Sequence, residues 1–156
     1  MDEVIKICAK YLVLVPVLVN LYILWSLDRS GRRRMFLIIL AGGILSLILA
    51  GIGSQLFSDP RPEFKDHVTP LFGHSDDNGF PSDHTLLASF LALVAYTYSK
   101  RIGYGLVAVA LVIGWARVAA HVHHAVDIAG SFLITAIAYF VVTKLLTRYL
   151  GSDQSK

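Results

Sequence analysis

The chain has 156 residues, of which 55% are hydrophobic and 16% are charged. Its mean hydropathy of +0.62 is too high for an ordinary soluble domain, so we interpret residues 1–156 as one integral membrane domain. The formal net charge of +3 is small, and we expect no nucleic-acid partner. We expect the bilayer and an amphiphilic ligand to be the partners instead.

Five hydrophobic segments follow one another along the chain, at residues 7–27, 35–57, 81–99, 102–119 and 126–146. A membrane-spanning helix needs about 20 apolar residues, and the last three segments have charge-free cores near or just below the minimum of about 17. Pro16 is expected to kink the first segment. The sequence therefore predicts an all-α integral membrane protein, a bundle of about five transmembrane helices with its active site at one membrane face.

Small residues recur every four positions in the second segment, which suits close helix packing; they are Gly42, Ser46, Ala50 and Ser54. The only long loop covers residues 58–80 and is rich in Pro, Gly, Asp and His. We expect its acidic residues Asp59, Asp76 and Asp77 to be solvated, and His67 and His74 to lie on its surface.

Basic residues indicate the topology. If the five segments alternate in direction, one side of the membrane receives most of the cations, namely Arg29, Arg32, Arg33, Arg34, Lys100, Arg101, Lys144, Arg148 and Lys156. The positive-inside rule places this side in the cytoplasm and the loop 58–80 outside. We therefore expect a protein of the cytoplasmic (inner) membrane with an external N-terminus. Arg61, His84, Arg117 and Asp127 then share the outer, periplasmic face.

The stretch from Arg117 to Asp127 combines ionisable residues with hydrophobic flanks, where such residues are usually functional. His123 and Asp127 are four residues apart and share a helix face, whereas Arg117 and His123 are six apart and do not. We therefore expect a helix ending near Arg117, a turn through His121 and a new helix beginning near His123. This geometry would surround a small anion with an arginine, an imidazole and a helix N-terminus.

Two arginines beside histidine indicate an oxygen-rich anion, and phosphate fits best. Two histidines from separate segments, His84 and His123, are able to divide the work of nucleophile and general acid. Asp127 is placed to orient His123 and to stabilise its cation.

These residues resemble the three motifs of the type 2 phosphatidic acid phosphatase superfamily, Lys-x6-Arg-Pro, Pro-Ser-Gly-His and Ser-Arg-x5-His-x3-Asp. The matching residues are Arg61-Pro62, Pro81-Ser-Asp-His84, and Arg117 with His123 and Asp127. The resemblance spans residues 54–127. The Pro-Ser-Asp-His form is similar to bacterial undecaprenyl-diphosphate phosphatases of the bacitracin-resistance type.

The resemblance implies a metal-independent mechanism without a cofactor. His123 would attack phosphorus to form a phosphohistidine, with Asp127 positioning it. His84 would protonate the leaving oxygen and later activate water. Arg61, Arg117 and Ser82 would bind the phosphoryl oxygens.

Three positions depart from the motifs. Ser54 replaces the lysine, and we expect Lys65 to substitute for that cation. Ala116 replaces the serine before Arg117. Asp83 replaces the glycine, and its carboxylate is expected to point away from phosphate or to pair with an arginine, at the edge of the phosphate-binding group.

Two other interpretations stay open. His121, His123, His124 and Asp127 offer the ligand types of a metal site, although the two arginines would repel a cation. A non-catalytic membrane scaffold that binds lipid headgroups would share the motif geometry. We favour an externally facing lipid phosphatase acting on undecaprenyl diphosphate, with the 1-phosphate of lipid A and phosphatidylglycerophosphate as alternative substrates.

Overall fold

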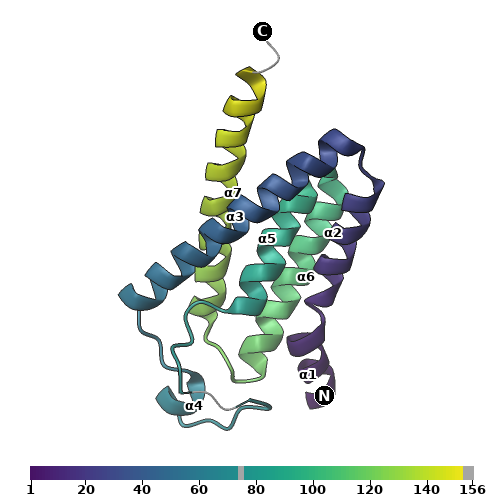
Figure 1. The fold of residues 1–156 in the computed structure, drawn as a ribbon. Helices are drawn as coiled ribbons and strands as arrows, with labels where there is room; N and C mark the ends of the chain where they lie inside the picture. Colours follow the sequence, from purple (N-terminus) through teal and green to yellow (C-terminus); the bar gives the residue numbers. More distant parts are fainter. Residues whose placement is uncertain (74–75, 153–156) are drawn as a thin grey trace.

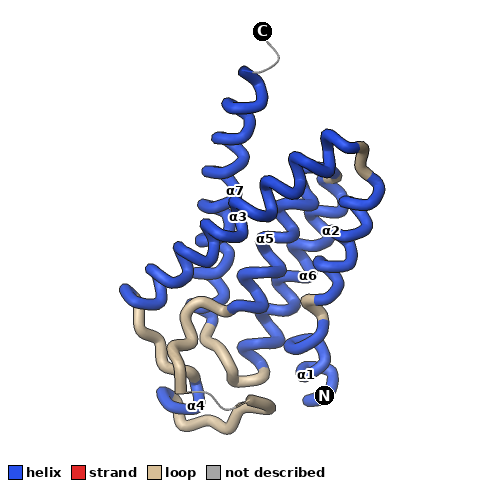
Figure 2. The backbone as a smooth tube through the Cα atoms, in the orientation of Figure 1, coloured by secondary structure: helices blue, strands red, loops and turns tan. Residues whose placement is uncertain are grey.

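The structure, a computed structural model, describes residues 1–73 and 76–152. Within these ranges the regular elements are all helices (Figure 2). They are α1 (Asp2–Tyr11), α2 (Leu14–Ser26), α3 (Arg29–Leu56), α4 (Pro62–Lys65), α5 (Asp83–Tyr98), α6 (Lys100–Ala119) and α7 (Ala125–Ser152). The prediction of an all-α membrane protein is confirmed.

Helix α5 forms the centre of the bundle. It packs against α2, α3, α6 and α7, and α3 crosses obliquely over it in Figure 1. A helix that is apolar on all sides is expected in a core, and α5 buries residues around its whole circumference, from Thr85 to Ala95. The small residues of α3 face this core. A Cβ atom at Gly42 would lie 2.8 Å from the ring of Phe90, so the two helices approach closely there.

The first hydrophobic segment is broken into α1 and α2 at residues 12–13. Pro16 has no N–H group to donate to the carbonyl of Leu12, which instead accepts from Val15 N at 3.0 Å. The expected kink is therefore a break that begins four residues before the proline. Asn20 then ties α2 to the core, because its Nδ2 atom donates to Leu91 O at 3.1 Å.

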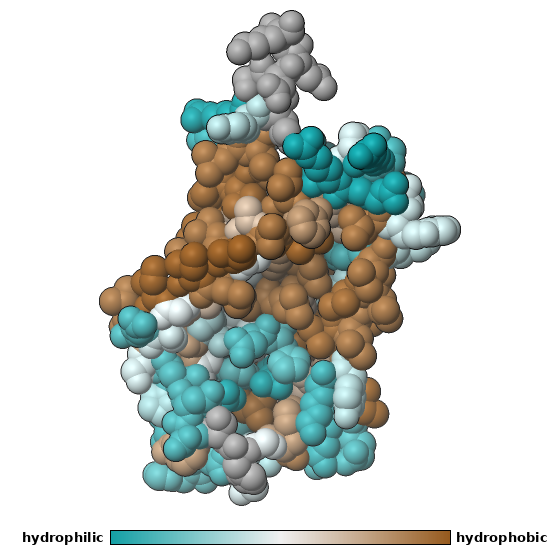
Figure 3. Space-filling view, in the orientation of Figure 1, coloured by the Kyte–Doolittle hydropathy of each residue, from teal (hydrophilic) through white to brown (hydrophobic). Residues whose placement is uncertain are grey.

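Four helical segments are long and apolar enough to cross a membrane, namely Asp2–Ser26, Arg29–Leu56, Lys100–Ala119 and Ala125–Tyr149. The remaining expected segment, 81–99, corresponds to α5, which has only 16 residues. Figure 3 shows an apolar band between two polar ends. The loop after α3, helix α4 and the turn between α6 and α7 gather at one of these ends, and the linker between α2 and α3 lies at the other (Figure 1).

Candidate active site

The turn between α6 and α7 folds much as its residue spacing predicts. Helix α6 ends at Ala119 and α7 begins at Ala125, and His121 adopts the left-handed conformation, with φ of 57°, that reverses the chain. Helix α7 thus begins two residues after His123, close to the expected position, and His123 itself lies in the turn. The turn brings Arg117, His123 and Asp127 together.

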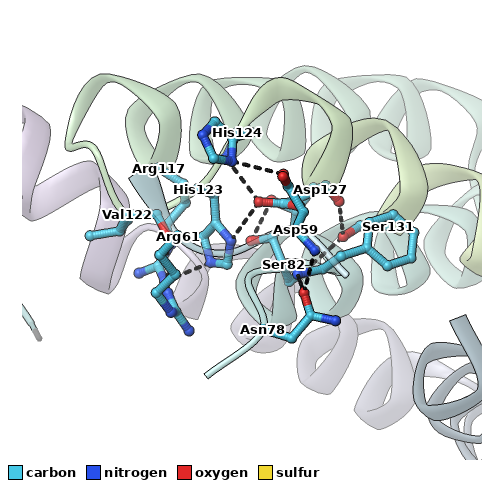
Figure 4. A network of polar contacts seen from close by, with 12 residues as sticks. Asp59, Arg61, Asn78, Ser82, Arg117, Val122, His123, His124, Asp127 and Ser131 are labelled. Atoms are coloured by element: carbon cyan, nitrogen blue, oxygen red, sulfur yellow. Dashed lines mark hydrogen bonds and ion pairs between the residues drawn. The ribbon is translucent and has the colours of Figure 1, made fainter. Parts of the chain in front are cut away.

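His123 lies between a cation and an anion. Its Nε2 atom is 3.1 Å from Arg117 Nη2, and its Nδ1 atom is 3.2 Å from Asp127 Oδ2 (Figure 4). These contacts fit a neutral ring whose Nδ1–H donates to Asp127 and whose Nε2 lone pair accepts from Arg117. Burial lowers the pKa of His123, and the charges of Arg117 and Arg61 lower it further against the opposing hydrogen bond with Asp127.

Asp127 is fully buried at the start of α7. Besides His123, its Oδ2 atom accepts the backbone N–H of His124 at 2.8 Å. The Ser131 hydroxyl lies 2.8 Å from Asp127 O and 3.0 Å from Ser82 O, which links α7 to the residue before α5 (Figure 4). Backbone contacts thus fix the position of the carboxylate relative to both helices.

Arg61 reaches the same turn from the long loop. Its Nη1 atom donates to Val122 O at 3.0 Å, while Nε and Nη2 donate to the carboxylate of Asp77 at 2.6 and 3.2 Å. Two of its donor positions therefore face a carboxylate of the chain itself. Arg117 Nε, which is buried, makes no hydrogen bond within the described residues. An oxygen-rich anion would satisfy such a donor.

The Pro81-Ser-Asp-His84 segment forms the N-terminal end of α5. Ser82 is fully buried at the N-cap position, and its hydroxyl accepts from Thr85 Oγ1 at 3.3 Å. Asp83 is exposed in the first turn and forms no ion pair with either arginine among the described residues. His84 is half-buried, within electrostatic range of Arg117 and His123. The segment therefore lies near Arg117, and its residues Pro81 and Asp83 line a cavity together with Arg61.

The expectation that Asp59 is a solvated loop charge is wrong. Its side chain is buried, with Lys65 Nζ at 2.5 Å from Oδ1 and His124 Nδ1 at 2.7 Å from Oδ2. Burial opposes ionisation of Asp59, but Lys65 and His124 together hold its pKa below the usual value. The sequence pattern missed this because His124, which contacts Asp59, lies in the turn before α7, far along the chain.

The remaining loop residues differ in their surroundings. Asp76 and His67 are exposed as expected, and His74 lies outside the described residues. Lys65, expected to contact phosphate, forms an ion pair with Asp59. His121 is exposed and separate from the group of metal-ligand types that the described residues contain, which is Asp59, His124 and Asp127.

Asn78 is a structural residue that sequence analysis did not identify. Its Oδ1 atom accepts from Asp59 N at 2.9 Å and from Phe80 N at 3.2 Å. Its Nδ2 atom donates to Ser54 O and Phe57 O at 2.7 and 2.9 Å. The side chain thus joins the end of α3 to both ends of the long loop. Asn78-Gly79 is a turn signal, but no local pattern predicts these distant partners.

Two cavities lie between Arg61 and the apolar bundle. One, of about 260 Å³, is lined by Arg61, Asp77, Asp83 and residues of α3 that include Leu47. The other, of about 440 Å³, shares Leu47 and Asp83 with it and continues between α3 and α5 to Phe90. We call this pair of cavities the α3–α5 groove. Its polar end carries Arg61, and its far end is apolar.

Comparison with known proteins gives consistent results. The model of the PAP2 superfamily matches residues 34–150, more than half of the chain. The undecaprenyl-diphosphatase BcrC of Bacillus subtilis is 28% identical over 141 residues, which cover 90% of this chain and 72% of that protein. The putative undecaprenyl-diphosphatase YbjG of Escherichia coli is 29% identical over 130 residues, which cover 83% of this chain and 65% of that protein.

Two solved structures share the fold. LpxE of Aquifex aeolicus is 28% identical, with a TM-score of 0.67 over 92% of this chain and 85% of that one. A PAP2-type phosphatidylglycerolphosphate phosphatase of Bacillus subtilis is 20% identical, with a TM-score of 0.66 over 94% and 77% of the two chains. At that identity the second structure shows the fold alone.

Proposed function

Because the chain belongs to the PAP2 superfamily, a family of membrane lipid phosphatases, we propose that it removes a phosphate from a lipid phosphate or diphosphate through a phosphohistidine at His123. The observation that carries this proposal is the contact chain Arg117–His123–Asp127, with 3.1 and 3.2 Å between successive partners. It presents a neutral nucleophile whose emerging positive charge would face a buried carboxylate.

The first step transfers the phosphoryl group to the enzyme. The Nε2 lone pair of His123 forms the N–P bond as the bond from phosphorus to the lipid oxygen breaks. His84 donates a proton to that oxygen, and the lipid product leaves. Arg117 must first release Nε2, and its guanidinium then turns its donors to the phosphoryl oxygens. Asp127 stabilises the cationic ring that the attack produces.

The second step regenerates the enzyme. His84, now neutral, takes a proton from water as the water oxygen attacks phosphorus. The N–P bond breaks, its electron pair returns to Nε2, and inorganic phosphate leaves. Arg61 and Arg117 stabilise the charge on the phosphoryl oxygens in both steps, with Ser82 beside them. Lys65 would join them only by leaving Asp59, and exposed Asp83 would turn from the anion. No metal ion enters either step.

The α3–α5 groove supports an amphiphilic substrate. Its polar end would hold the phosphate near Arg61, and its apolar end at Phe90 would hold part of a hydrocarbon tail. The undecaprenyl-diphosphatase of Bacillus subtilis supports undecaprenyl diphosphate as the first choice. Lipid A 1-phosphate and phosphatidylglycerophosphate, the alternatives from the sequence analysis, stay in the proposal as second candidates.

The distribution of basic residues supports a cytoplasmic membrane location with the site facing outward. Helix α3 begins at Arg29, with the cluster Arg32 to Arg34 in its first two turns, at the end of the bundle opposite the site (Figure 1). Lys100 begins α6 at that same end. Cations on one side of a bundle mark its cytoplasmic face.

The test is phosphate release from undecaprenyl diphosphate, lipid A and phosphatidylglycerophosphate in detergent, with excess EDTA. We expect EDTA-resistant release by the wild type and none by His123→Asn, while His67→Asn, at an exposed loop histidine, stays active. Release that EDTA abolishes would contradict the metal-independent mechanism. Lipid binding without turnover by a folded wild type would favour the scaffold interpretation. The ranking of substrates would identify the lipid.

A further inference from the structure

A second histidine–carboxylate pair, His124 with Asp59, lies next to the pair of His123 and Asp127. His124 Nδ1 is 2.7 Å from Asp59 Oδ2, and His124 Nε2 is 3.0 Å from Asp66 Oδ2. The Nε2 contact is a hydrogen bond, whereas the Nδ1 contact is a close approach without hydrogen-bond geometry, and His124 Nδ1 is buried without a hydrogen bond in the described residues. A doubly protonated imidazolium would place its positive charge between the two carboxylates. Asp59 is 1% exposed, so its carboxylate depends on such partners.

This pair is connected to Asp127 in two ways. The backbone N–H of His124 donates to Asp127 Oδ2 at 2.8 Å, so anchoring the ring of His124 fixes the direction of that donor. Carboxylate oxygens of Asp59 and Asp127 and a ring nitrogen of His124 also lie within 4.8 Å of one another. Asp59 Oδ2 and Asp127 Oδ1 are both buried without a hydrogen bond in the described residues. A cation among them reduces the repulsion between the two carboxylates.

We propose that His124, held as an imidazolium by Asp59 and Asp66, is a positioning residue that orients and electrostatically balances Asp127. Three carboxylates and one cation surround it. They are Asp59 in the long loop, Asp66 at the C-terminal end of α4, Asp127 in α7, and Lys65, which pairs with Oδ1 of Asp59. The pair does not touch the substrate phosphorus in this proposal. It acts through Asp127 and therefore through the charge that forms on His123.

This inference rests on the proposed phosphatase function, so its experiment measures kcat and KM of the wild type in parallel. His124→Gln removes the cation and leaves two buried carboxylates facing each other. We expect kcat to fall about tenfold, within the range of couplings between contacting residues. KM should stay within twofold, because the arginines still bind phosphate. His67→Gln is the matched control on the exposed loop.

The double variant Asp59→Asn with His124→Gln gives the sharper readout. It removes one of the two carboxylates together with the cation, and a neutral amide pair remains. We expect its kcat to exceed that of His124→Gln alone, whereas a purely structural role predicts a double variant at least as impaired. Asp66→Asn, at a half-exposed partner, should lower kcat less than His124→Gln does.

Three results would overturn the proposal. One is a kcat for His124→Gln within twofold of the wild type. Another is a double variant no better than the single one. The third is a wild-type kcat that Mg²⁺, Mn²⁺ or Zn²⁺ raises and EDTA removes, since Asp59, His124 and Asp127 would then hold a metal ion in place of a proton. An inactive wild type would refute the proposed function itself, which separates the two failures.

Discussion

At the scale of single residues, the two ring nitrogens of His123 face groups of opposite charge, Arg117 and Asp127. These groups and burial should determine how the activity depends on pH. Burial and the two arginines hold the pKa of His123 below its usual value of about 6.5. In the proposed mechanism attack needs the unprotonated Nε2, so activity should be lost as the pH falls through this lowered pKa. We expect the acid limb of kcat/KM to lie below about pH 6.5.

Asp127→Asn supplies the control for this assignment. The hydrogen bond with Asp127 raises the pKa of His123 against the other effects, so its loss should move the acid limb to still lower pH. The plateau rate should also fall, by up to about 10⁴-fold if the aspartate acts as in serine-protease triads. An acid limb at or above pH 6.5 in the wild type would contradict a neutral, buried His123.

In the proposed mechanism Asp77 competes with phosphate for Arg61, because its carboxylate accepts two hydrogen bonds from the guanidinium. Its side chain is 59% exposed, so the pair contributes at most about 1 kcal/mol. We expect Asp77→Asn to lower the inhibition constant of inorganic phosphate about two- to fivefold. Asp76→Asn, at the exposed neighbour, is the control. Weaker phosphate inhibition in Asp77→Asn would show that the carboxylate assists binding.

The proposed catalytic residues were easier to predict than the residues that hold them in place. Arg117, His123 and Asp127 are close in sequence, so helical spacing and one turn suffice to bring them together. Asp59 contacts His124 in the turn before α7, and Asn78 contacts backbone carbonyls at the end of α3. The residues next to Asp59 and Asn78 in the sequence do not predict these contacts. Lys65 looked available for phosphate for the same reason, because the burial of Asp59 could not be read from a polar loop.

At the scale of elements, Phe80 separates α3 from α7 just before the Pro81-Ser-Asp-His84 segment. A Cβ atom at Gly130 would lie 2.1 Å from its ring, and one at Gly53 would lie 3.1 Å away on the other side. The ring therefore has little room to retreat. We expect Gly130→Ala to lower the free energy of unfolding by about 1–3 kcal/mol, as overpacked cores do, and to reduce kcat by displacing Ser82 and His84.

Gly105→Ala is the matched control, since a Cβ atom there meets nothing within 4 Å. Denaturation midpoints in detergent and phosphate release would be measured on both variants. Equal stability and activity of Gly130→Ala and the wild type would mean that Phe80 moves without cost, and that its packing does not position the start of α5.

The helices themselves were largely predictable, because hydrophobic runs and polar interruptions define them. The expected segment 102–119 lies within α6. The expected segment 35–57 lies within α3 except for its last residue. The differences have local causes. Pro16 divides the first segment, and hydrogen bonds within the turn place His123 ahead of α7. The central position of α5 depends on packing against four other helices, which hydropathy alone does not determine.

At the scale of the whole molecule, the 16 residues of α5 rise about 24 Å, whereas a typical hydrocarbon core is about 30 Å thick. Lys100 and Arg101 follow this helix and favour the charged membrane surface at that end. The shortfall therefore falls at the other end, where His84 lies. His84, at the start of α5, would then sit several ångströms inside the edge of the hydrocarbon core.

This depth makes bilayer thickness a determinant of activity. Phosphatidylcholine vesicles of increasing acyl-chain length have a thicker hydrocarbon core. Around the short helix α5 the bilayer must then become locally thinner, or its acyl chains cover the site. We expect kcat/KM to fall steadily with chain length, while activity in detergent gives the thickness-independent reference. A rate that does not change with chain length would place the start of α5 at the membrane surface. The short central helix would otherwise make the enzyme responsive to the lipids that surround it as well as to the lipid it hydrolyses.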